Sequence, residues 1–194
     1  MKKRIVIFAS GSGTNAQNII NHFKQSKIAE VVQVLSNNEH AKVLKRAEAS
    51  NIETSAFSKE ALFDENGVLV LLKNLKPDLI VLAGFLLKFP ETILNAFPNK
   101  VINIHPALLP KYGGKGMYGK YVHEAVVANA ESESGITIHY VNKNYDEGAI
   151  IFQATVALEK EDTATVVAEK VQKLEHEFFP KVIESLLIKT DTNP

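Results

Sequence analysis

Strand-like and helix-like segments alternate along most of this 194-residue chain, and this alternation restricts its fold more than any other feature. Runs of β-branched and other apolar residues are separated by segments whose apolar residues recur every three or four positions. The predicted strands are Arg4 to Ala9, Val31 to Leu35, Ile52 to Phe57, Asp78 to Ala83 and Val101 to His105. The predicted helices between them are Thr14 to Lys24, Ala41 to Ser50, Lys59 to Leu75 with an interruption at Asn66-Gly67, and Glu91 to Phe97. This pattern predicts an α/β fold with a doubly wound, mainly parallel sheet.

The C-terminal part of the chain departs from this regular alternation. After a predicted helix from Tyr121 to Asn129, strands from Gly135 to Asn142 and from Ala149 to Val156 follow each other across a polar turn, which predicts an antiparallel pair. A long helix is predicted from about Asp162 to Leu187, with a cap at Asp162 or Thr163 and a kink at Pro180. The evidence for this helix is a set of apolar residues that recur at helical spacing, namely Val167, Val171, Leu174, Phe178, Val182 and Leu186. We therefore expect a sheet with a mixed C-terminal edge and a long C-terminal helix.

Composition excludes several classes of protein. The chain has 22 basic and 22 acidic residues and no cysteine. The absence of cysteine excludes a disulfide framework, a thiolate zinc site, an iron–sulfur cluster and a cysteine nucleophile, and it fits a cytoplasmic location. Balanced charge gives no overall field to attract nucleic acid. No apolar run is longer than that from Leu79 to Ala83, which is far shorter than the roughly 20 residues that span a bilayer. We expect one domain over residues 1–194, with no nucleic-acid or membrane partner.

A glycine-rich segment follows the first predicted strand and leads into the first helix. It contains Gly11, Ser12, Gly13, Thr14 and Asn15. At such a position backbone N–H groups and the positive end of the helix favour an anion, and glycines let a phosphate come close to the backbone. Ala16 replaces the third glycine of a dinucleotide fingerprint, so a monophosphate is the predicted ligand. The alternative is that the glycines only make a tight turn.

Three polar residues predict acyl-transfer chemistry. Asn103 and His105 lie two positions apart on a predicted strand, so they share one face near its C-terminal end, where open α/β sheets bind ligands. An amide can stabilise a developing oxyanion, and an imidazole can transfer a proton. Asp146, in the turn Tyr145-Asp146-Glu147-Gly148, would favour the protonated imidazole if it lay close. The alternative is a structural histidine and an ordinary acidic turn. The histidines form no H-x-x-x-H pair, so no metal site is expected.

Several segments together resemble the phosphoribosylglycinamide formyltransferases, a family of the folate-dependent formyltransferase superfamily with a Rossmann-like fold. The resemblance covers Ile5 to about Leu187. The segments that carry it are Ser10 to Asn15, Ala83-Gly84-Phe85, Asn103 to Tyr112, Gly135 to Val141, Asp146-Glu147-Gly148 and Glu175-His176. The resemblance implies transfer of a formyl group from 10-formyltetrahydrofolate to the primary amine of glycinamide ribonucleotide, in purine synthesis. It also implies a phosphate-binding half at about residues 1–100 and a folate and catalytic half at about 101–190.

The same resemblance implies roles for individual residues. Asn103 and His105 match the catalytic pair, and Asp146 matches the carboxylate that keeps the histidine effective. The substrate-binding residues would be Gly11, Ser12, Gly13, Thr14, Asn15, Gln172 and Glu175. The folate-binding residues would be Lys59, Leu86, Leu87, Lys88, Phe89 and Asn103. The amine would attack the formyl carbon directly, and Asn103 with protonated His105 would hold the oxyanion of the tetrahedral intermediate.

Two segments depart from the commoner pattern of that family. Leu87 stands where many members have a basic residue, and the loop from Lys111 to Lys120 is longer and richer in glycine. Within this loop Met117 and Tyr118 are interpreted either as a mobile lid or as loop filler. The alternatives are a formyltetrahydrofolate hydrolase or a formyltransferase for another amine, which normally have a further domain, an oxidoreductase, or a nucleotide-binding module without catalysis. For the oligomeric state we expect a monomer or a homodimer.

Overall fold

A seven-stranded sheet runs through the centre of the computed structural model, which describes residues 1–189. The strands are β1 (Lys3–Phe8), β2 (Ala29–Ser36), β3 (Glu53–Ala56), β4 (Leu79–Leu82), β5 (Val101–His105), β6 (Glu133–Tyr140) and β7 (Ile150–Ala157). The helices are α1 (Thr14–Phe23), α2 (Lys42–Glu48), α3 (Lys59–Phe63), α4 (Val68–Leu75), α5 (Glu91–Ala96), α6 (Lys120–Ala128) and α7 (Ala164–Lys189). Each element lies within a few residues of its predicted position.

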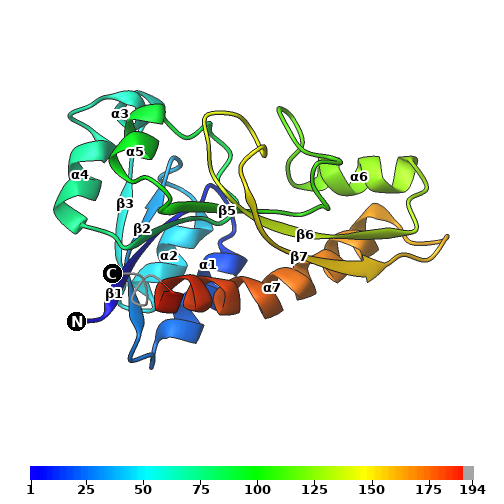
Figure 1. Ribbon diagram of the computed structural model, residues 1–194, viewed down its shortest axis with the longest axis horizontal. Coiled ribbons are helices and arrows are strands. Elements are labelled where there is room, and N and C mark those ends of the chain that lie inside the picture. Colours follow the sequence, from blue (N-terminus) through cyan, green and yellow to red (C-terminus); the bar gives the residue numbers. More distant parts are fainter. Residues whose placement is uncertain (190–194) are drawn as a thin grey trace.

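The strand order is β3-β2-β1-β4-β5-β6-β7. The first five of these strands are parallel, whereas β6 pairs antiparallel with both β5 and β7. The predicted α/β class, parallel sheet and mixed C-terminal edge are therefore confirmed (Figure 1). Because the chain winds outward in opposite directions from β1, the C-terminal ends of β1 and β4 border a crevice of the kind that binds ligands in open α/β sheets.

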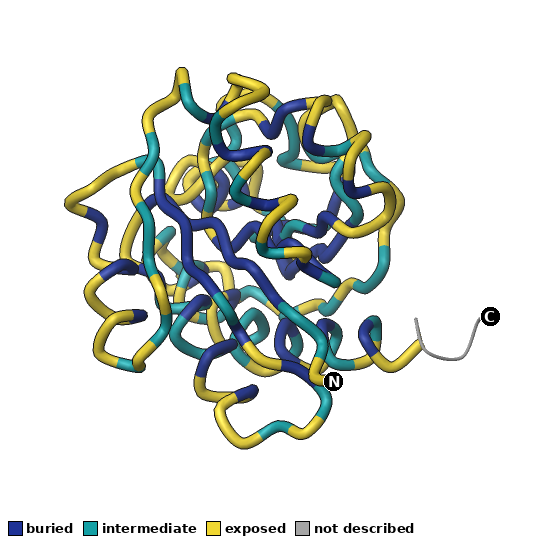
Figure 2. The backbone as a smooth tube through the Cα atoms, turned by 90° about the vertical axis from the view of Figure 1, so that its left-hand side faces the viewer, coloured by how far each residue is buried: buried dark blue, intermediate teal, exposed yellow. Residues whose placement is uncertain are grey.

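Helices cover both faces of the sheet, and successive β1 residues point to opposite faces. Ile5 and Ile7 join a core beneath α1, α2, α6 and α7, whereas Val6 and Phe8 join a second core beneath α3, α4 and α5. The buried backbone is concentrated in the central strands, with exposed segments outside them (Figure 2). No helix among residues 1–189 combines the length and apolar character needed to cross a membrane.

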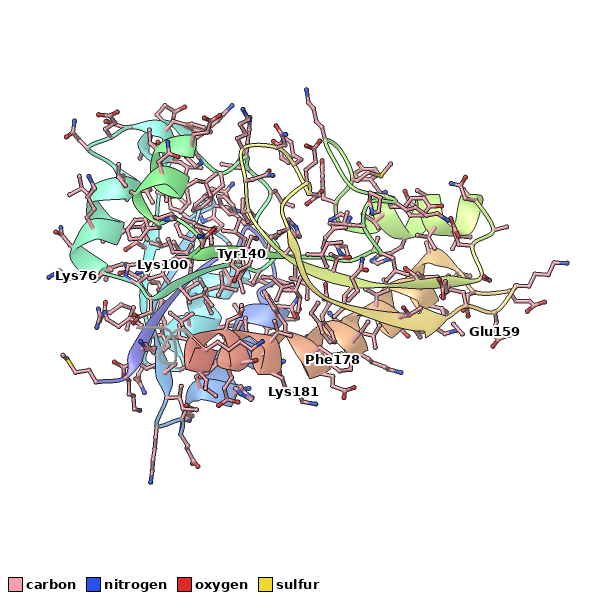
Figure 3. The ribbon with its side chains drawn as sticks, viewed as in Figure 1. Lys76, Lys100, Tyr140, Glu159, Phe178 and Lys181 are labelled. Carbon is pink, nitrogen blue, oxygen red and sulfur yellow. The ribbon has the colours of Figure 1, made fainter. Side chains whose placement is uncertain are left out.

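The apolar residues that recur at helical spacing in α7 all pack on the core, although Leu174, Phe178, Val182 and Leu186 are only partly buried. Val167 and Val171 are buried, and the buried residues that follow them are Phe179, Pro180, Ile183 and Leu187. Phe178 is only partly buried and lies on the flank of the helix against Phe152 of β7, with Lys181 Nζ 5.5 Å from its ring (Figure 3). In the second half of α7 the most buried residues lie one position after the apolar residues that were predicted from spacing. They continue the helical spacing from Val171 through Glu175, whose side chain contacts Asn15 of α1.

Other boundaries differ less. The segment predicted as one interrupted helix forms two, α3 and α4, separated by a turn in which the Asp64 carboxylate accepts the Asn66 N–H at 2.9 Å. The α7 helix continues through Pro180, and the Thr163 hydroxyl accepts the Val166 N–H at 3.4 Å before its first turn. The Leu109–Pro110 peptide bond is cis.

Candidate active site

The C-terminal ends of β1, β4 and β5 open onto one cleft with a volume of about 680 Å³. The loop from β5 to α6 and the yellow loop between β6 and β7 rise on the same side of the sheet and complete its wall (Figure 1). The predicted site residues that line it are Gly11, Ser12, Gly13, Thr14, Asn15, Leu86, Asn103, His105, Asp146, Gln172 and Glu175. Residues from both halves of the chain therefore meet at one cavity.

The loop after β1 presents the beginning of α1 to this cleft. Gly13 immediately precedes the helix with a left-handed backbone, φ 74° and ψ 28°, and no side chain of the described residues caps the helix start. The Gly13 carbonyl accepts the first helical hydrogen bond, from Gln17, at 2.9 Å. The N–H groups of the first turn are therefore available to an anion, and the helix dipole favours negative charge at this point.

The C-terminal helix α7 contacts this loop from the other side of the cleft. Gln172 Nε2 donates to the Thr14 hydroxyl at 3.4 Å, and Asn15 Nδ2 donates to Glu175 Oε2 at 2.9 Å. Burial raises the pKa of Glu175, against the opposing effect of the Asn15 hydrogen bond. A raised pKa favours the neutral carboxyl, which repels a neighbouring phosphate less than a carboxylate does. The residues predicted to bind one substrate thus contact one another across 160 positions of sequence.

The predicted catalytic residues also meet. The Asp146 carboxylate has Oδ2 at 3.6 Å from His105 Nδ1 and Oδ1 at 3.6 Å from His139 Nε2. Asn103 Nδ2 lies 3.1 Å from His139 Nε2, because Asn103 and His139 are directly opposite each other on β5 and β6. His139, which was not among the predicted site residues, therefore connects Asn103 to Asp146.

Hydrogen-bond partners define the state of each imidazole. A carbonyl oxygen only accepts, so His105 Nε2 donates to Tyr112 O at 2.7 Å, which leaves Nδ1 as the nitrogen that gains or loses a proton beside Asp146. His139 Nδ1 likewise donates to Tyr140 O at 2.9 Å, and its Nε2 lies 3.1 Å from the Asn103 amide nitrogen and 3.6 Å from Asp146 Oδ1. The contact between Asn103 and His139 uses one of the two Asn103 N–H bonds and leaves the other for a ligand in the cleft.

Burial and charge act in opposite directions at this site. Burial lowers the pKa of His105, although Asp146 and the Tyr112 carbonyl both act to raise it. For Asp146, burial raises the pKa, but His139, His105 and the Gly114 N–H together outweigh it, so that the pKa lies below its ordinary value. Asp146 is therefore a carboxylate at neutral pH, placed to stabilise a proton that arrives at His105 Nδ1.

Backbone groups of the glycine-rich loop contribute to the site, which sequence reasoning did not identify. The Tyr112 carbonyl accepts from His105, and the Gly114 N–H donates to Asp146 Oδ2 at 2.9 Å. Main-chain contacts have no residue-type signature, so no sequence signal could have found them. In residues 1–189 no group of three or more His, Cys, Asp and Glu side chains is arranged to hold a metal ion.

The predicted folate segment divides between the cleft and the core. Leu86 lines the cleft, and its N–H donates to the Ser10 hydroxyl at 3.0 Å. Phe89 is buried in the core, with its ring 5.2 Å from that of Phe8. Leu87 packs at the edge of the same core, and exposed Lys88, like Lys59 at the start of α3, lies outside the cleft lining. Of this set, only Leu86 and Asn103 reach the cavity in this structure.

His123 is a further titratable residue in the cleft wall. Its ring is buried on α6, and its Nδ1 has no hydrogen-bond partner among the described residues. Burial lowers its pKa, and the nearby His105 lowers it further. No feature of the sequence indicates that the His123 side chain would face the cleft.

His123 is expected to make stability depend on pH. Its folded-state pKa lies below the unfolded value, so below about pH 6.5 the unfolded chain binds more protons and the free energy of unfolding falls. The buried His105 and the partly buried His176 act in the same direction, and Glu175 acts in the opposite one. We therefore expect His123→Asn to lose less stability than wild type between about pH 7.5 and pH 5.5 in urea titrations. Equal losses in the two proteins would contradict this assignment.

Comparisons with known proteins agree with this geometry. The sequence model of the formyl transferase family matches residues 3–183. The phosphoribosylglycinamide formyltransferase of Bacillus subtilis (strain 168) is 34% identical over 190 residues, which cover 95% of each chain. The chloroplastic phosphoribosylglycinamide formyltransferase of Arabidopsis thaliana is 33% identical over 191 residues, and the match spans 95% of this chain but 65% of that protein's length.

Structural similarity extends over the same range. The crystal structure of phosphoribosylglycinamide formyltransferase from Bacillus halodurans matches with a TM-score of 0.87 and 35% identity, and the match covers 97% of each chain. At this level of identity and coverage, the two proteins are similar in sequence as well as in fold. The chain therefore belongs to the formyl transferase family and, within it, to the phosphoribosylglycinamide formyltransferases.

Proposed function

We propose that this protein transfers the formyl group of 10-formyltetrahydrofolate to the primary amine of glycinamide ribonucleotide in purine biosynthesis. The observation that carries the proposal is the meeting of two sites in one cleft, an anion-binding helix start at Gly13 and the group Asn103, His105 and Asp146. A substrate with both a phosphate and an amine would occupy both sites at once. The family and its named members support the same reaction.

The phosphate of glycinamide ribonucleotide would bind the loop from Gly11 to Asn15, where backbone N–H groups and the dipole of α1 favour an anion. Gln172 and Glu175, which already contact Thr14 and Asn15, would then face the ribose. This placement directs the amine away from the loop, toward Asn103 and His105 on the β5 strand. In this arrangement residues of the proposed first half, about 1–100, would supply the phosphate site, and residues of the second half, about 101–190, would supply the reacting groups together with Gln172 and Glu175 of α7.

The formyl folate would enter from the part of the cleft that Ala83, Phe85 and Leu86 line at the end of β4. Apolar walls with nearby backbone polar groups suit a flat, hydrogen-bonding ring system. Among the residues that the resemblance assigned to folate, Leu86 and Asn103 line the cleft. The others would contact more distant parts of the folate or would support Leu86 through packing.

The reaction begins with attack of the amine nitrogen on the formyl carbon. A new C–N bond forms, and the formyl oxygen becomes an oxyanion in a tetrahedral intermediate. The free Asn103 N–H donates to this oxyanion, which contributes about 3 kcal/mol when such a donor is preorganised in a dry site. His105 contributes to the stability of the oxyanion through the positive charge that its ring carries once Nδ1 has accepted the proton of the amine.

Proton movement completes the transfer. Neutral His105 accepts the proton that the attacking nitrogen loses, at Nδ1 beside Asp146, and becomes an imidazolium. The imidazolium then gives this proton to the folate nitrogen as the bond between that nitrogen and the formyl carbon breaks. Asp146 stabilises the imidazolium between these steps, because its pKa is low enough to keep it ionised. The products are a formamide and tetrahydrofolate, with no net change in protons.

Asp146→Asn is expected to lower kcat about a hundredfold. The amide keeps the size of the side chain but removes the charge that stabilises protonated His105. The KM for glycinamide ribonucleotide should change less than about threefold, since Asp146 contacts His105, His139 and Gly114 rather than the proposed phosphate loop, residues 11–15. Steady-state kinetics with both substrates checks this, and Glu147→Gln, on the neighbouring residue, is the matched control. A kcat equal to that of the control would remove Asp146 from the mechanism.

The function itself is tested by incubating the protein with glycinamide ribonucleotide and 10-formyltetrahydrofolate. Formylation of the amine, followed by mass spectrometry, is the expected result. Release of formate at the same rate without the amine would instead identify a hydrolase. Transfer to a different amine in competition with glycinamide ribonucleotide would correct the acceptor while retaining the reaction class.

A further inference from the structure

Three large apolar side chains are exposed around the cleft. Leu86 is 50% exposed, Tyr118 46% and Tyr145 40%, and all three line the cavity. They come from the segment after β4, from the glycine-rich loop before α6 and from the loop between β6 and β7. Single exposed apolar residues are ordinary on a protein surface, but convergence of three from separate segments on one cavity indicates a binding surface for an apolar or aromatic group.

The cleft divides chemically between its two ligands. The loop from Gly11 to Asn15, with Gln172 and Glu175, supplies polar groups and a helix start suited to a phosphate. Leu86, Tyr118 and Tyr145 supply apolar surface and aromatic rings. A phosphoribosyl group gains little from such rings, so the apolar part is left for the other substrate, whose folate skeleton contains two flat aromatic systems.

Tyr118 is held in place by its neighbours. Its ring makes an edge-to-face contact with Tyr121, with 5.5 Å between ring centres and planes at 87°. Its carbonyl oxygen accepts the Tyr121 N–H at 3.3 Å, close to the first turn of α6. An edge-to-face pair leaves at least one face of the Tyr118 ring free of Tyr121, and an aromatic ligand can stack there.

We propose that Tyr118 is a folate-binding residue, whose ring stacks on the flat aromatic part of the formyl donor as a third wall of the site with Leu86 and Tyr145. The inference rests on the proposed function, because it takes the second substrate to be a folate. It assigns the glycine-rich loop two tasks, one through the backbone at Tyr112 and Gly114, and one through this side chain. Selectivity for the formyl donor then depends on the glycine-rich loop that follows β5.

The test compares Tyr118→Ala and Tyr118→Phe with wild type. The dissociation constant of 5-formyltetrahydrofolate, which has the same ring systems, is measured by titration calorimetry, and KM is measured for both substrates of the transfer reaction. We expect Tyr118→Ala to weaken folate binding about five- to twentyfold and to raise the donor KM similarly, with the KM for glycinamide ribonucleotide unchanged. Tyr118→Phe keeps the ring and should behave as wild type.

The matched control is Phe63→Ala, which removes an aromatic ring of equal exposure, 46%, on α3 outside the cleft lining. Wild-type folate affinity in Tyr118→Ala, equal weakening in Tyr118→Phe, or an equal rise in both KM values would each overturn the assignment. A wild-type protein that binds the folate but formylates no amine would refute the proposed function, while the titrations still decide the role of Tyr118. A wild-type protein that binds no folate would refute both.

Discussion

Replacing His105 with alanine is expected to lower kcat for formyl transfer by about three to four orders of magnitude. The substitution removes the nitrogen that accepts the amine proton and the positive charge that stabilises the oxyanion, and it leaves Asp146 with only His139 and the Gly114 N–H of its three described partners. The dissociation constant of glycinamide ribonucleotide should stay within about twofold, because the phosphate loop and α7 form their contacts independently of β5.

Single-turnover kinetics and equilibrium binding separate these two effects. His40→Ala, which truncates a histidine whose side chain is 86% exposed outside the cleft, serves as the control and should retain full activity. Retention of more than about a tenth of wild-type kcat in His105→Ala would exclude a direct role in proton transfer. A large loss of ribonucleotide affinity would instead show that His105 acts by maintaining the cleft.

The spacing of residues along strands is why the meeting of Asn103 and His105 at one cleft could be predicted. A strand alternates its faces every residue, so Asn103 and His105 had to project together once β5 was recognised. The parallel topology then placed the ends of β1, β4 and β5 at one edge. The shared face of Asn103 and His105 follows from local periodicity, and the position of the strand ends follows from a general rule about open sheets. The structure therefore differs little from both predictions.

Positions that depend on tertiary context were harder to predict. Glu175 faces inward because it contacts Asn15, so the apolar pattern of α7 breaks at the position where the helix is functional. Phe89 follows the exposed Leu86 by three residues and yet enters the core, because its ring packs on Phe8. In both cases the partner is far away in sequence, and composition of the segment carries no information about it.

The meeting of Asp146 with His105 also rests on tertiary structure. Asp146 lies in a loop between two antiparallel strands, and its backbone has a positive φ of 55° that turns its carboxylate toward the cleft. Sequence reasoning could identify an acidic turn, but neither the conformation of the turn nor the Gly114 N–H that binds its carboxylate has a signature in residue type. The resemblance to known formyltransferases supplied what periodicity could not.

Gly13→Ala is expected to lower the free energy of unfolding by about 3 kcal/mol. A Cβ at this position would lie 2.4 Å from Val43 Cγ2 and 2.8 Å from Val43 Cα, and the φ of 74° is unfavourable for any residue with a side chain. Val43 cannot retreat, because it is 1% exposed in the core and its N–H donates to Gly11 O at 3.2 Å. The loop and α2 must therefore separate, which would also raise the KM for glycinamide ribonucleotide more than about tenfold.

Gly11→Ala provides a control within the same loop. A Cβ on Gly11 would have no described heavy atom within 4 Å, so the free energy of unfolding should change by less than about 0.5 kcal/mol. Urea denaturation of the two variants compares the same chemical change, one methyl group, at positions two residues apart. Equal stability of the two would show that the close contact between the phosphate loop and α2 is dispensable, and the anion site would then owe its shape to α1 alone. A large difference would show that α2, which contributes no residue to the cleft lining, fixes the position of the backbone proposed to bind the phosphate.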